Sequence, residues 1–371
     1  MSIRKTACDS RIAPWRIDSE EERRLAARAD VDEDAKVLYV QYYRDNDPVY
    51  YAKGLEMIEK VLRTFRPSAS SLERERYIND MIYSLHRFGC MFDEYFLMDF
   101  EKYNTFGRNS FITDKNRWDY YAKLNSQQGR ALFNNKFKAY EIFKEYYNRE
   151  LIQISDDNDF LSFTDFRVKH HSFIVKPMLG SGGRGVYIER ESDEGDRVVF
   201  ERIRNIGPVV IETLIKQSSD MEKLHPGSLN TLRIPTVSTR KGIKVFHPFL
   251  RIGVGDSIVD NAASGGIIAP VDPDLGIVTQ FGITEKGEKY LKHPNTGFVI
   301  PGFRIPDWDG AVSFVKALAR VVPENHYVGW DCALTEHGWV MVEGNAQGQF
   351  VTQYASKEGM RDELDEVLKE I

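Results

Sequence analysis

The spacing of apolar and polar positions divides the chain into a helical first part and a strand-rich second part. Asp47-Pro48 is typical of a helix start, and apolar residues then recur at helical spacing as far as Phe65. A second helix is predicted after Ser70, which forms a capping-box pattern with Glu73. Further helices are expected over residues 92–100 and 138–147.

From residue 172 onward, short apolar segments alternate with glycine-containing turns, which is typical of strands. Only four of the 27 glycines lie in residues 1–150, whereas 14 of the 18 tyrosines do. The predicted strands are 172–176, 186–189, 209–212, 231–237, 244–251, 267–269, 277–280, 327–335 and 339–345. A helix is expected after Asp307 or Asp309, and a charged helix over 356–371 closes the chain.

Charge and cysteine content narrow the class of protein. The net charge is −6 and no Lys/Arg run is present, which argues against nucleic acid as a partner. No apolar stretch is long enough for a transmembrane segment, and the three scattered cysteines favour a reducing cytoplasm.

Residues 1–34 are expected to form a partly disordered arm with a helix over 19–28.

The strongest chemical signal is a predicted hairpin near the C-terminus. A turn centred on His337 would place Asp331 opposite Glu343, with Asn345 on the same face. Opposed carboxylates repel unless a cation lies between them, and carboxylate and amide oxygens suit Mg²⁺. The hairpin therefore favours a metal site, with a solvated acidic face as the alternative.

A second signal is a glycine-rich loop between two predicted strands. Lys176-Pro177 ends one strand, and the loop contains Gly180, Ser181, Gly182, Gly183 and Gly185. No helix follows, so neither a Walker A loop nor a Rossmann fingerprint fits. Glycines let backbone N–H groups approach phosphate oxygens, which favours a phosphate-binding flap over a plain flexible hairpin.

Three weaker signals lie between these two. Glu212 lies at the end of an apolar strand and is followed by Leu214. These residues could bind the amino group and the face of adenine, or they could be an ordinary strand end. Arg233 and Arg251 lie among apolar residues on neighbouring strands. Burial of a guanidinium there costs much free energy unless an anion neutralises it. Asn261 lies in a polar, glycine-containing loop that could hold an acyl or phosphate group.

The order of these signals resembles that of the ATP-grasp superfamily. The stretches LHPGSLNTLRIPTV, DNAASGG, HPNTG, VGWDCALTEHG and VEGN resemble the sugar-transfer-associated ATP-grasp family in particular, over about residues 135–353. The resemblance implies an α+β fold in which two α+β subdomains clamp ATP. A mainly helical N-terminal region precedes them.

The expected domain boundaries follow this resemblance. Residues 1–34 would be the arm, 35–130 a helical domain, 131–208 the subdomain with the flap, and 209–371 the subdomain with the Mg²⁺-binding hairpin. The helical segment replaces the N-terminal Rossmann unit of the biotin-carboxylase type that better-known relatives carry.

The resemblance also implies roles for individual residues. Lys136 and Lys176 would contact phosphates under the flap, Glu212 and Leu214 would frame adenine, and Asp220 or Glu222 would bind the ribose. Asp331, Glu343 and Asn345 would hold two Mg²⁺ ions. Arg233, Arg251 and Asn261 would act at the γ-phosphate and the acyl phosphate, and Lys292, His293 and Thr296 would help form the acceptor pocket.

The implied activity is that of an ATP-dependent carboxylate–amine ligase. A carboxylate would attack the γ-phosphate to form an acyl phosphate, and an amine would then give an amide, with release of ADP and phosphate. The substrate would be a small molecule or sugar-linked compound of polysaccharide biosynthesis. Two alternatives remain, a phosphotransferase with a hydroxyl acceptor and a nucleotide-binding module without chemistry.

Overall fold

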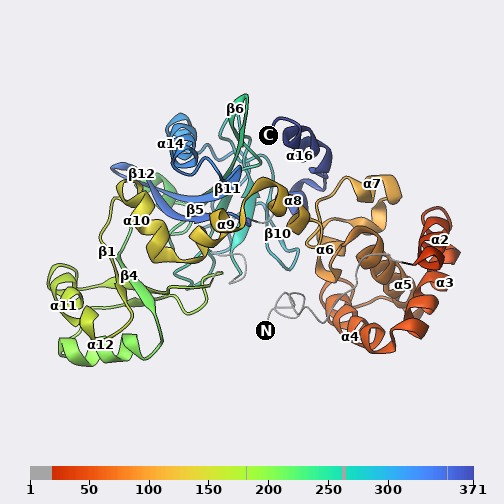
Figure 1. The fold of residues 1–371 in the computed structure, drawn as a ribbon, viewed down its shortest axis with the longest axis horizontal. Helices are drawn as coiled ribbons and strands as arrows, with labels where there is room; N and C mark the ends of the chain where they lie inside the picture. The colour runs from red at the N-terminus through yellow and green to blue at the C-terminus, as the bar shows by residue number, and fades with distance from the viewer. Residues whose placement is uncertain (1–18, 181, 261–264, 349) are drawn as a thin grey trace. The chain divides into compact units, whose positions relative to one another are not determined.

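The computed structural model describes residues 19–180, 182–260, 265–348 and 350–371. Backbone contacts divide the chain into two compact units. The helical unit comprises Met1–Tyr120, Glu285–Glu288 and Gln349–Lys369, and the sheet unit comprises Tyr121–Thr284, Lys289–Gly348 and Glu370–Ile371. Figure 1 labels the helices and strands of both units.

Local capping signals set the helix boundaries of the helical unit. The Asp47 side chain accepts a hydrogen bond from the Tyr50 N–H at 3.1 Å, and Ser70 and Glu73 form both bonds of a capping box. The helices expected after these residues are therefore confirmed. The helices are α2 (Glu20–Ala29), α3 (Glu33–Asn46), α4 (Pro48–Phe65), α5 (Ser71–Phe88), α6 (Phe92–Leu97), α7 (Thr105–Asn109), α8 (Arg117–Leu124), α15 (Gln353–Ser356) and α16 (Arg361–Leu368), with α8 continuing into the sheet unit.

A buried ionic cluster lies at the centre of the helical unit. The Asp80 carboxylate on α5 accepts two hydrogen bonds from the Arg108 guanidinium, both at 2.7 Å, and one from Lys36 Nζ at 2.7 Å. The Tyr95 hydroxyl also donates to Asp80. Burial alone would raise the pKa of Asp80, but Arg108 and Lys36 hold it below its ordinary value.

The sheet unit contains two antiparallel sheets. Its helices are α9 (Gln127–Asn134), α10 (Lys136–Tyr147), α11 (Phe160–Lys169), α12 (Asp196–Arg204), α13 (Ser219–Glu222) and α14 (Trp308–Val321). Its strands are β1 (Leu151–Ile154), β2 (Phe173–Pro177), β3 (Tyr187–Glu189), β4 (Val209–Thr213), β5 (Thr231–Thr239), β6 (Gly242–Val245), β7 (Phe249–Ile252), β8 (Ile267–Pro270), β9 (Gly282–Ile283), β10 (Lys289–Tyr290), β11 (Tyr327–Thr335) and β12 (Gly338–Asn345).

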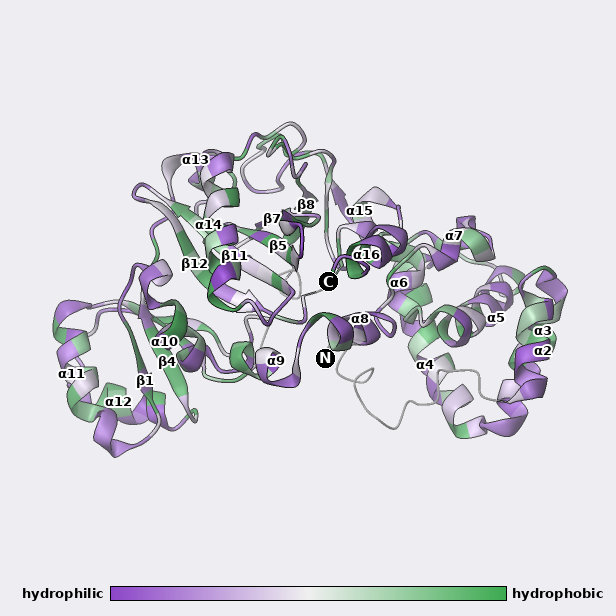
Figure 2. Cartoon of the chain, turned by 45° about the horizontal axis from the view of Figure 1, so that its top comes forward, coloured by the Kyte–Doolittle hydropathy of each residue, from purple (hydrophilic) through white to green (hydrophobic). Residues whose placement is uncertain are grey.

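The smaller sheet has the strand order β1-β4-β2-β3. Helices α11 and α12 lie on one side of it, and both carry hydrophobic as well as hydrophilic residues (Figures 1 and 2). Phe163 and Phe166 of α11, Phe200 of α12, and Phe173 of β2 are fully buried together. Burial of these aromatic rings holds the two helices against the sheet.

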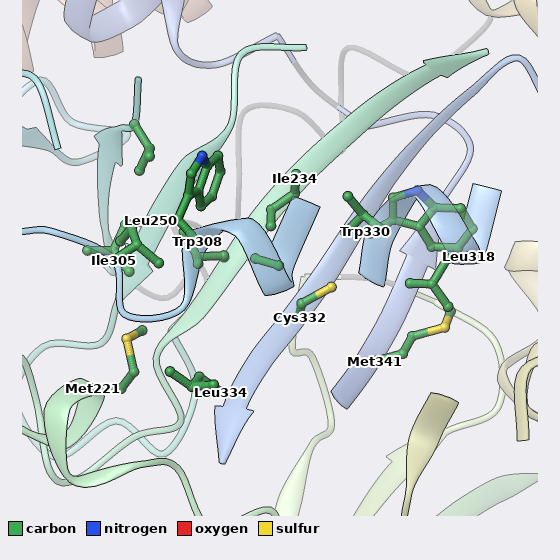
Figure 3. Packing of buried hydrophobic residues seen from close by; sticks show 14 of the residues in the cluster. Met221, Ile234, Leu250, Ile305, Trp308, Leu318, Trp330, Cys332, Leu334 and Met341 are labelled. Atoms are coloured by element: carbon green, nitrogen blue, oxygen red, sulfur yellow. The ribbon is translucent and has the colours of Figure 1, made fainter. Parts of the chain in front are cut away.

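The larger sheet has the order β10-β9-β8-β7-β5-β11-β12, with β6 paired to β5. Its core includes Trp330 of β11, which is fully buried, and Leu318 of α14 (Figure 3). The Trp330 indole N–H donates to Thr236 Oγ1 at 2.9 Å, so the largest core side chain has a polar partner as well as apolar neighbours. This packing supports the strands that carry the candidate site.

Several expected boundaries were wrong. The strand expected over 244–251 is interrupted, because His247 has a φ of 47° and separates β6 from β7. The strand expected over 277–280 is absent, and only single bridges at Ile277 and Val278 replace it. The helix expected over 356–371 is split, since Lys357 adopts a left-handed conformation between α15 and α16.

The pattern also missed elements that tertiary packing stabilises. Strand β1, the two-residue strands β9 and β10, and helices α11 and α12 were not expected. The helix expected over 19–28 is confirmed as α2, capped by Ser19. In the described part of the chain, no helix combines the length and the apolar character that a membrane crossing requires.

Candidate functional site

The β11–β12 hairpin places two carboxylates opposite each other. The register pairs Asp331 with Glu343 and Gly329 with Asn345, as the sequence predicted. The hairpin differs from the predicted one in two ways. Its turn is one residue shorter, because Thr335 pairs with Gly338 and only Glu336 and His337 lie between them, and a β-bulge at Val342 adds one residue to β12. The two differences offset each other, so the predicted pairing of Asp331 with Glu343 is kept.

Asp331 is the centre of a buried ionic network on the larger sheet. Its carboxylate accepts hydrogen bonds from the Arg233 guanidinium of β5, one of them at 2.8 Å, and from Arg251 Nη1 of β7 at 2.7 Å. Burial alone would raise the pKa of Asp331, but these two arginines lower it to about 2. Asp331 therefore stays ionised and orients both guanidiniums.

The network continues to Asp260, on the segment after β7. Its carboxylate accepts a hydrogen bond from Arg251 Nη2 at 2.7 Å and another from the Thr231 backbone N–H at 2.8 Å. The Thr231 hydroxyl donates to it as well. Arg251 thus lies between two carboxylates, and its orientation is fixed from both sides.

Glu343 is the second carboxylate of the hairpin. Burial, followed by the negative charge of Asp331, raises the pKa of Glu343 above its ordinary value. Asn345 Nδ2 donates to Glu343 Oε1 at 3.2 Å. A cation bound beside Glu343 would therefore favour its ionised form.

The glycine flap lies beside this acidic cluster. Gly180, Gly182, Gly183 and Gly185 all have positive φ angles, between 68° and 112°, which a residue with a Cβ rarely adopts. Lys136 Nζ donates to the Gly180 carbonyl at 2.9 Å, which ties the start of α10 to the flap. Burial lowers the pKa of Lys136.

Glu212 is a buried counter-ion between the flap strand and the hairpin. It pairs with Lys176 Nζ at 2.9 Å and with Arg149 at 2.7 Å, while Arg149 Nη1 donates to the Met341 carbonyl at 2.6 Å. Although burial opposes ionisation, the two cations lower the pKa of Glu212 to about 2. Glu212 thus orients Lys176, a function that the strand-end pattern did not suggest.

Two neighbouring cavities lie beside the glycine flap and the hairpin, and some residues line both. One has a volume of about 110 Å³, and its walls include Lys136, Lys176, Gly180, Gly182, Gly183, Arg251, Asp331 and Glu343. The other, of about 240 Å³, is lined by Glu212–Gln217 and Glu222 among others. Lys176, Ile174, Leu229, Ile258 and Val342 border both cavities. The first cavity is charged, and the second offers apolar side chains and exposed backbone.

Other expected site residues lie elsewhere or are not described. Asp220 is exposed and pairs with Lys223 at 2.6 Å, whereas Glu222 lines the second cavity. Lys292, His293 and Thr296 line neither cavity. Ser181 and Asn261 lie outside the described residues.

One member of the site escaped the sequence analysis. Arg149 follows α10 without any motif around it, and its partner Glu212 is 63 residues away. Asp260 is the first residue of the polar loop expected to hold an acyl or phosphate group, but the sequence assigned no role to its carboxylate. Buried ion pairs between distant residues leave no periodic trace in a sequence.

The residues at the hairpin fit a magnesium ion. Among the described residues, no group of three or more His, Cys, Asp or Glu side chains could hold a metal on its own. Asp331, Glu343 and the Asn345 amide provide hard oxygen donors, but both Asp331 oxygens already meet arginines. Such a partial ligand set suits Mg²⁺ that also binds phosphate oxygens.

Comparison with protein families gives one match. The family model described as sugar-transfer associated ATP-grasp matches residues 115–369. This range contains both cavities, the flap and the hairpin. No curated protein matches the chain.

Comparison with solved structures finds distant likenesses. ATP-grasp ligase PsnB, complexed with minimal precursor, Mg and ADP, is 15% identical with a TM-score of 0.41, covering 67% of this chain and 61% of that one. D-Alanine-D-Alanine ligase from Helicobacter pylori is 12% identical with a TM-score of 0.42, covering 67% and 64%. N5-carboxyaminoimidazole ribonucleotide synthetase is 13% identical with a TM-score of 0.38, covering 60% and 46%. The chain thus spans less than two thirds of each.

Proposed function

The chain belongs to the sugar-transfer associated ATP-grasp family, and from this premise we propose that it is an ATP-dependent carboxylate–amine ligase. One observation carries the proposal. A pair of facing carboxylates, Asp331 and Glu343, lines the same cavity as a glycine flap and two lysines. This arrangement suits a triphosphate whose charge is shared between Mg²⁺ and cationic side chains.

The two cavities suit the two ends of ATP. In this proposal the phosphates occupy the charged cavity, where Lys136 and Lys176 neutralise them and the flap N–H groups donate to their oxygens. Adenine occupies the second cavity, against Leu214 and the exposed backbone of the adjoining segment. Glu222, which lines that cavity, is the acid proposed for the ribose hydroxyls.

The chemistry then requires positioning and charge stabilisation. When bound, Mg²⁺ would be held by Asp331, Glu343 and Asn345 and would neutralise the triphosphate. A substrate carboxylate oxygen attacks the γ-phosphorus, the bond to the β-phosphate oxygen breaks, and ADP leaves. Arg251 and Arg233, oriented by Asp331, stabilise the charge on the transferring phosphoryl group.

The second step uses the acyl phosphate. An amine attacks its carbonyl carbon, inorganic phosphate leaves, and the amine loses a proton to give the amide. We propose a sugar-linked or polysaccharide-related compound as the substrate, as the description of the family suggests. No side-chain nucleophile is needed, since the attacking groups belong to the substrates.

Product analysis tests this proposal. Purified protein is incubated with Mg-ATP and pooled amino acids, amino sugars and sugar acids, and ADP, AMP and phosphate are quantified separately. A ligase gives ADP and an equal amount of phosphate only when both an acid and an amine are present. The Glu343→Gln protein, purified in the same way, shows whether a contaminating ATPase contributes.

Other product patterns contradict the ligase. Acceptor-dependent ADP without free phosphate means that the phosphoryl group stays on the product, and the protein is then a phosphotransferase. Tight nucleotide binding without turnover in any pool favours a binding module.

A further inference from the structure

Two segments of the sheet unit repeat one short motif, His-Pro-x-Ser/Thr. The first is His225-Pro226-Gly227-Ser228, and the second, from His293 to Thr296, is His-Pro-Asn-Thr. In both, the imidazole Nδ1 meets the hydroxyl three residues later, at 2.8 Å for Ser228 and 3.2 Å for Thr296. The two rings lie 5.3 Å apart, so the motifs are neighbours in the fold.

The other nitrogen of each ring binds a single backbone segment. His293 Nε2 lies 2.7 Å from the Gly253 carbonyl oxygen, and His225 Nε2 lies 2.9 Å from that of Gly255. Because a carbonyl oxygen can only accept, Nε2 carries the proton in both rings. Asn295 adds a third bond, since its Oδ1 accepts from the Gly255 N–H at 2.8 Å.

The start of this segment, at Gly253, is tightly packed. Both histidine side chains are buried, with 3% and 1% of their surface exposed for His225 and His293. A Cβ on Gly253 would lie 2.2 Å from Ser228 Oγ, so only glycine permits this approach. Burial also lowers the pKa of His293, which keeps that ring neutral with one donor and one acceptor.

The held segment connects two members of the candidate site. Gly253 follows β7 and is two residues from Arg251, and the chain then leads to Asp260. Arg251 bonds to both Asp260 and Asp331, so a shift of this segment would move the guanidinium away from the cavity. The histidines themselves line neither cavity, and both nitrogens of each ring have partners within the protein.

We propose that His225 and His293 are positioning residues that together hold the Gly253–Gly255 segment, and through it Arg251 and Asp260, for recognition of the γ-phosphate. This inference rests on the proposed ATP site. The sequence predicted that His293 and Thr296 help to bind the acceptor. The proposal instead gives His293 the role of holding the backbone at Gly253, with Thr296 as its partner. Two rings acting on one segment should behave as a single unit.

Nucleotide binding separates this role from general support of the fold. Dissociation constants for Mg-ADP and Mg-AMPPNP are measured for the wild-type chain and for His225→Ala, His293→Ala and the double variant. In His293→Ala, loss of this contact should weaken Mg-AMPPNP binding about tenfold and leave Mg-ADP within about twofold, because ADP lacks the γ-phosphate. Ser228, the partner of His225, lines the second cavity, so His225→Ala and the double variant are compared by Mg-AMPPNP alone. The double variant should be no worse than either single variant.

Conservative variants keep the test decisive if an alanine variant fails to fold. His293→Gln retains an N–H donor for Gly253 and should restore most of the Mg-AMPPNP affinity. Asn295→Ala removes only one bond at an exposed residue and should weaken Mg-AMPPNP about threefold. His171→Ala, at an exposed histidine, is the matched control and should change neither constant.

Equal weakening of both nucleotides in His293→Ala, or no weakening of either, would overturn the positioning role. Additive losses in the double variant would also contradict it, because they would mean two independent effects. Failure of the wild-type chain to bind either nucleotide would instead refute the proposed function. The two failures are thus distinguishable.

Discussion

Asp80 in the helical unit and Asp331 in the sheet unit are both buried carboxylates held by two cationic side chains. Asp80 meets Lys36 and Arg108, and Asp331 meets Arg233 and Arg251. In both, the cations keep the carboxylate ionised against the cost of burial. Buried ion pairs by themselves therefore do not distinguish a site from a structural cluster.

The surroundings of the two carboxylates differ. Asp331 has Glu343 opposite it, and both line a cavity together with the glycine flap. Asp80 instead accepts a further hydrogen bond from Tyr95 within a packed helical core. A second carboxylate directly opposite the first, lining a cavity with lysines and a glycine flap, is what indicates a ligand.

The largest expected loss of stability comes from Asp80→Ala. The change leaves Lys36 and Arg108 buried without their anion, which should lower the free energy of unfolding by about 3–5 kcal/mol. Urea unfolding followed by circular dichroism measures this. A loss below about 1 kcal/mol would show that the cluster is not structural and would remove the contrast with Asp331.

Glu343→Gln should have the opposite profile. It removes a carboxylate whose pKa is raised by burial and by Asp331, so the free energy of unfolding should stay the same or increase slightly. ADP formation should fall roughly 1,000-fold, about 4 kcal/mol in the barrier, because the metal ligand set is broken. Turnover near the wild-type rate would refute the metal assignment.

A pH titration probes a buried neutral group in the helical unit. Burial lowers the pKa of His86 to about 4, so the unfolded chain protonates first as the pH falls below about 6.5. Stability from this group is complete above pH 7 and decreases as the pH falls toward 4. From pH 7.5 to 5 the loss due to His86 should be about 2 kcal/mol, so the total loss should be smaller by this amount in His86→Leu.

The smallest expected effect is that of an exposed helix cap. Ser70 Oγ accepts from the Glu73 N–H and both residues are exposed, so Ser70→Ala should cost about 1 kcal/mol of unfolding free energy. Thermal or urea unfolding measures it, with Ser71→Ala as the neighbouring control. A cost as large as that of Asp80→Ala would mean that burial is not what separates these sites.

Local signals in the sequence predicted much of this architecture. Asp47 and Ser70 began helices where expected, because capping side chains satisfy backbone N–H groups within three residues. The predicted pairing of Asp331 with Glu343 was also correct, although the hairpin was not. Its turn is one residue shorter than predicted, and the bulge at Val342 makes up for this residue. Alternation along a strand gives the face of a residue, but not a bulge.

Longer-range features could not be predicted in this way. His247 interrupts the expected strand 244–251 with a left-handed backbone conformation, which apolar alternation does not reveal. The two-residue strands β9 and β10 are too short for any periodicity. Their pairing is decided by neighbouring strands of the larger sheet.

The sequence by itself determined the helix starts, the glycine flap and the facing carboxylates, since each depends on residues within a few positions or on one hairpin. Only the tertiary structure decided that Arg149 and Lys176 share Glu212, and that Arg251 lies between Asp260 and Asp331. Arg233 and Asp331 are 98 residues apart, and Arg149 and Glu212 are 63 apart. Such pairs form because burial removes the water that would otherwise solvate each charge, and the need for a partner acts in space rather than along the chain.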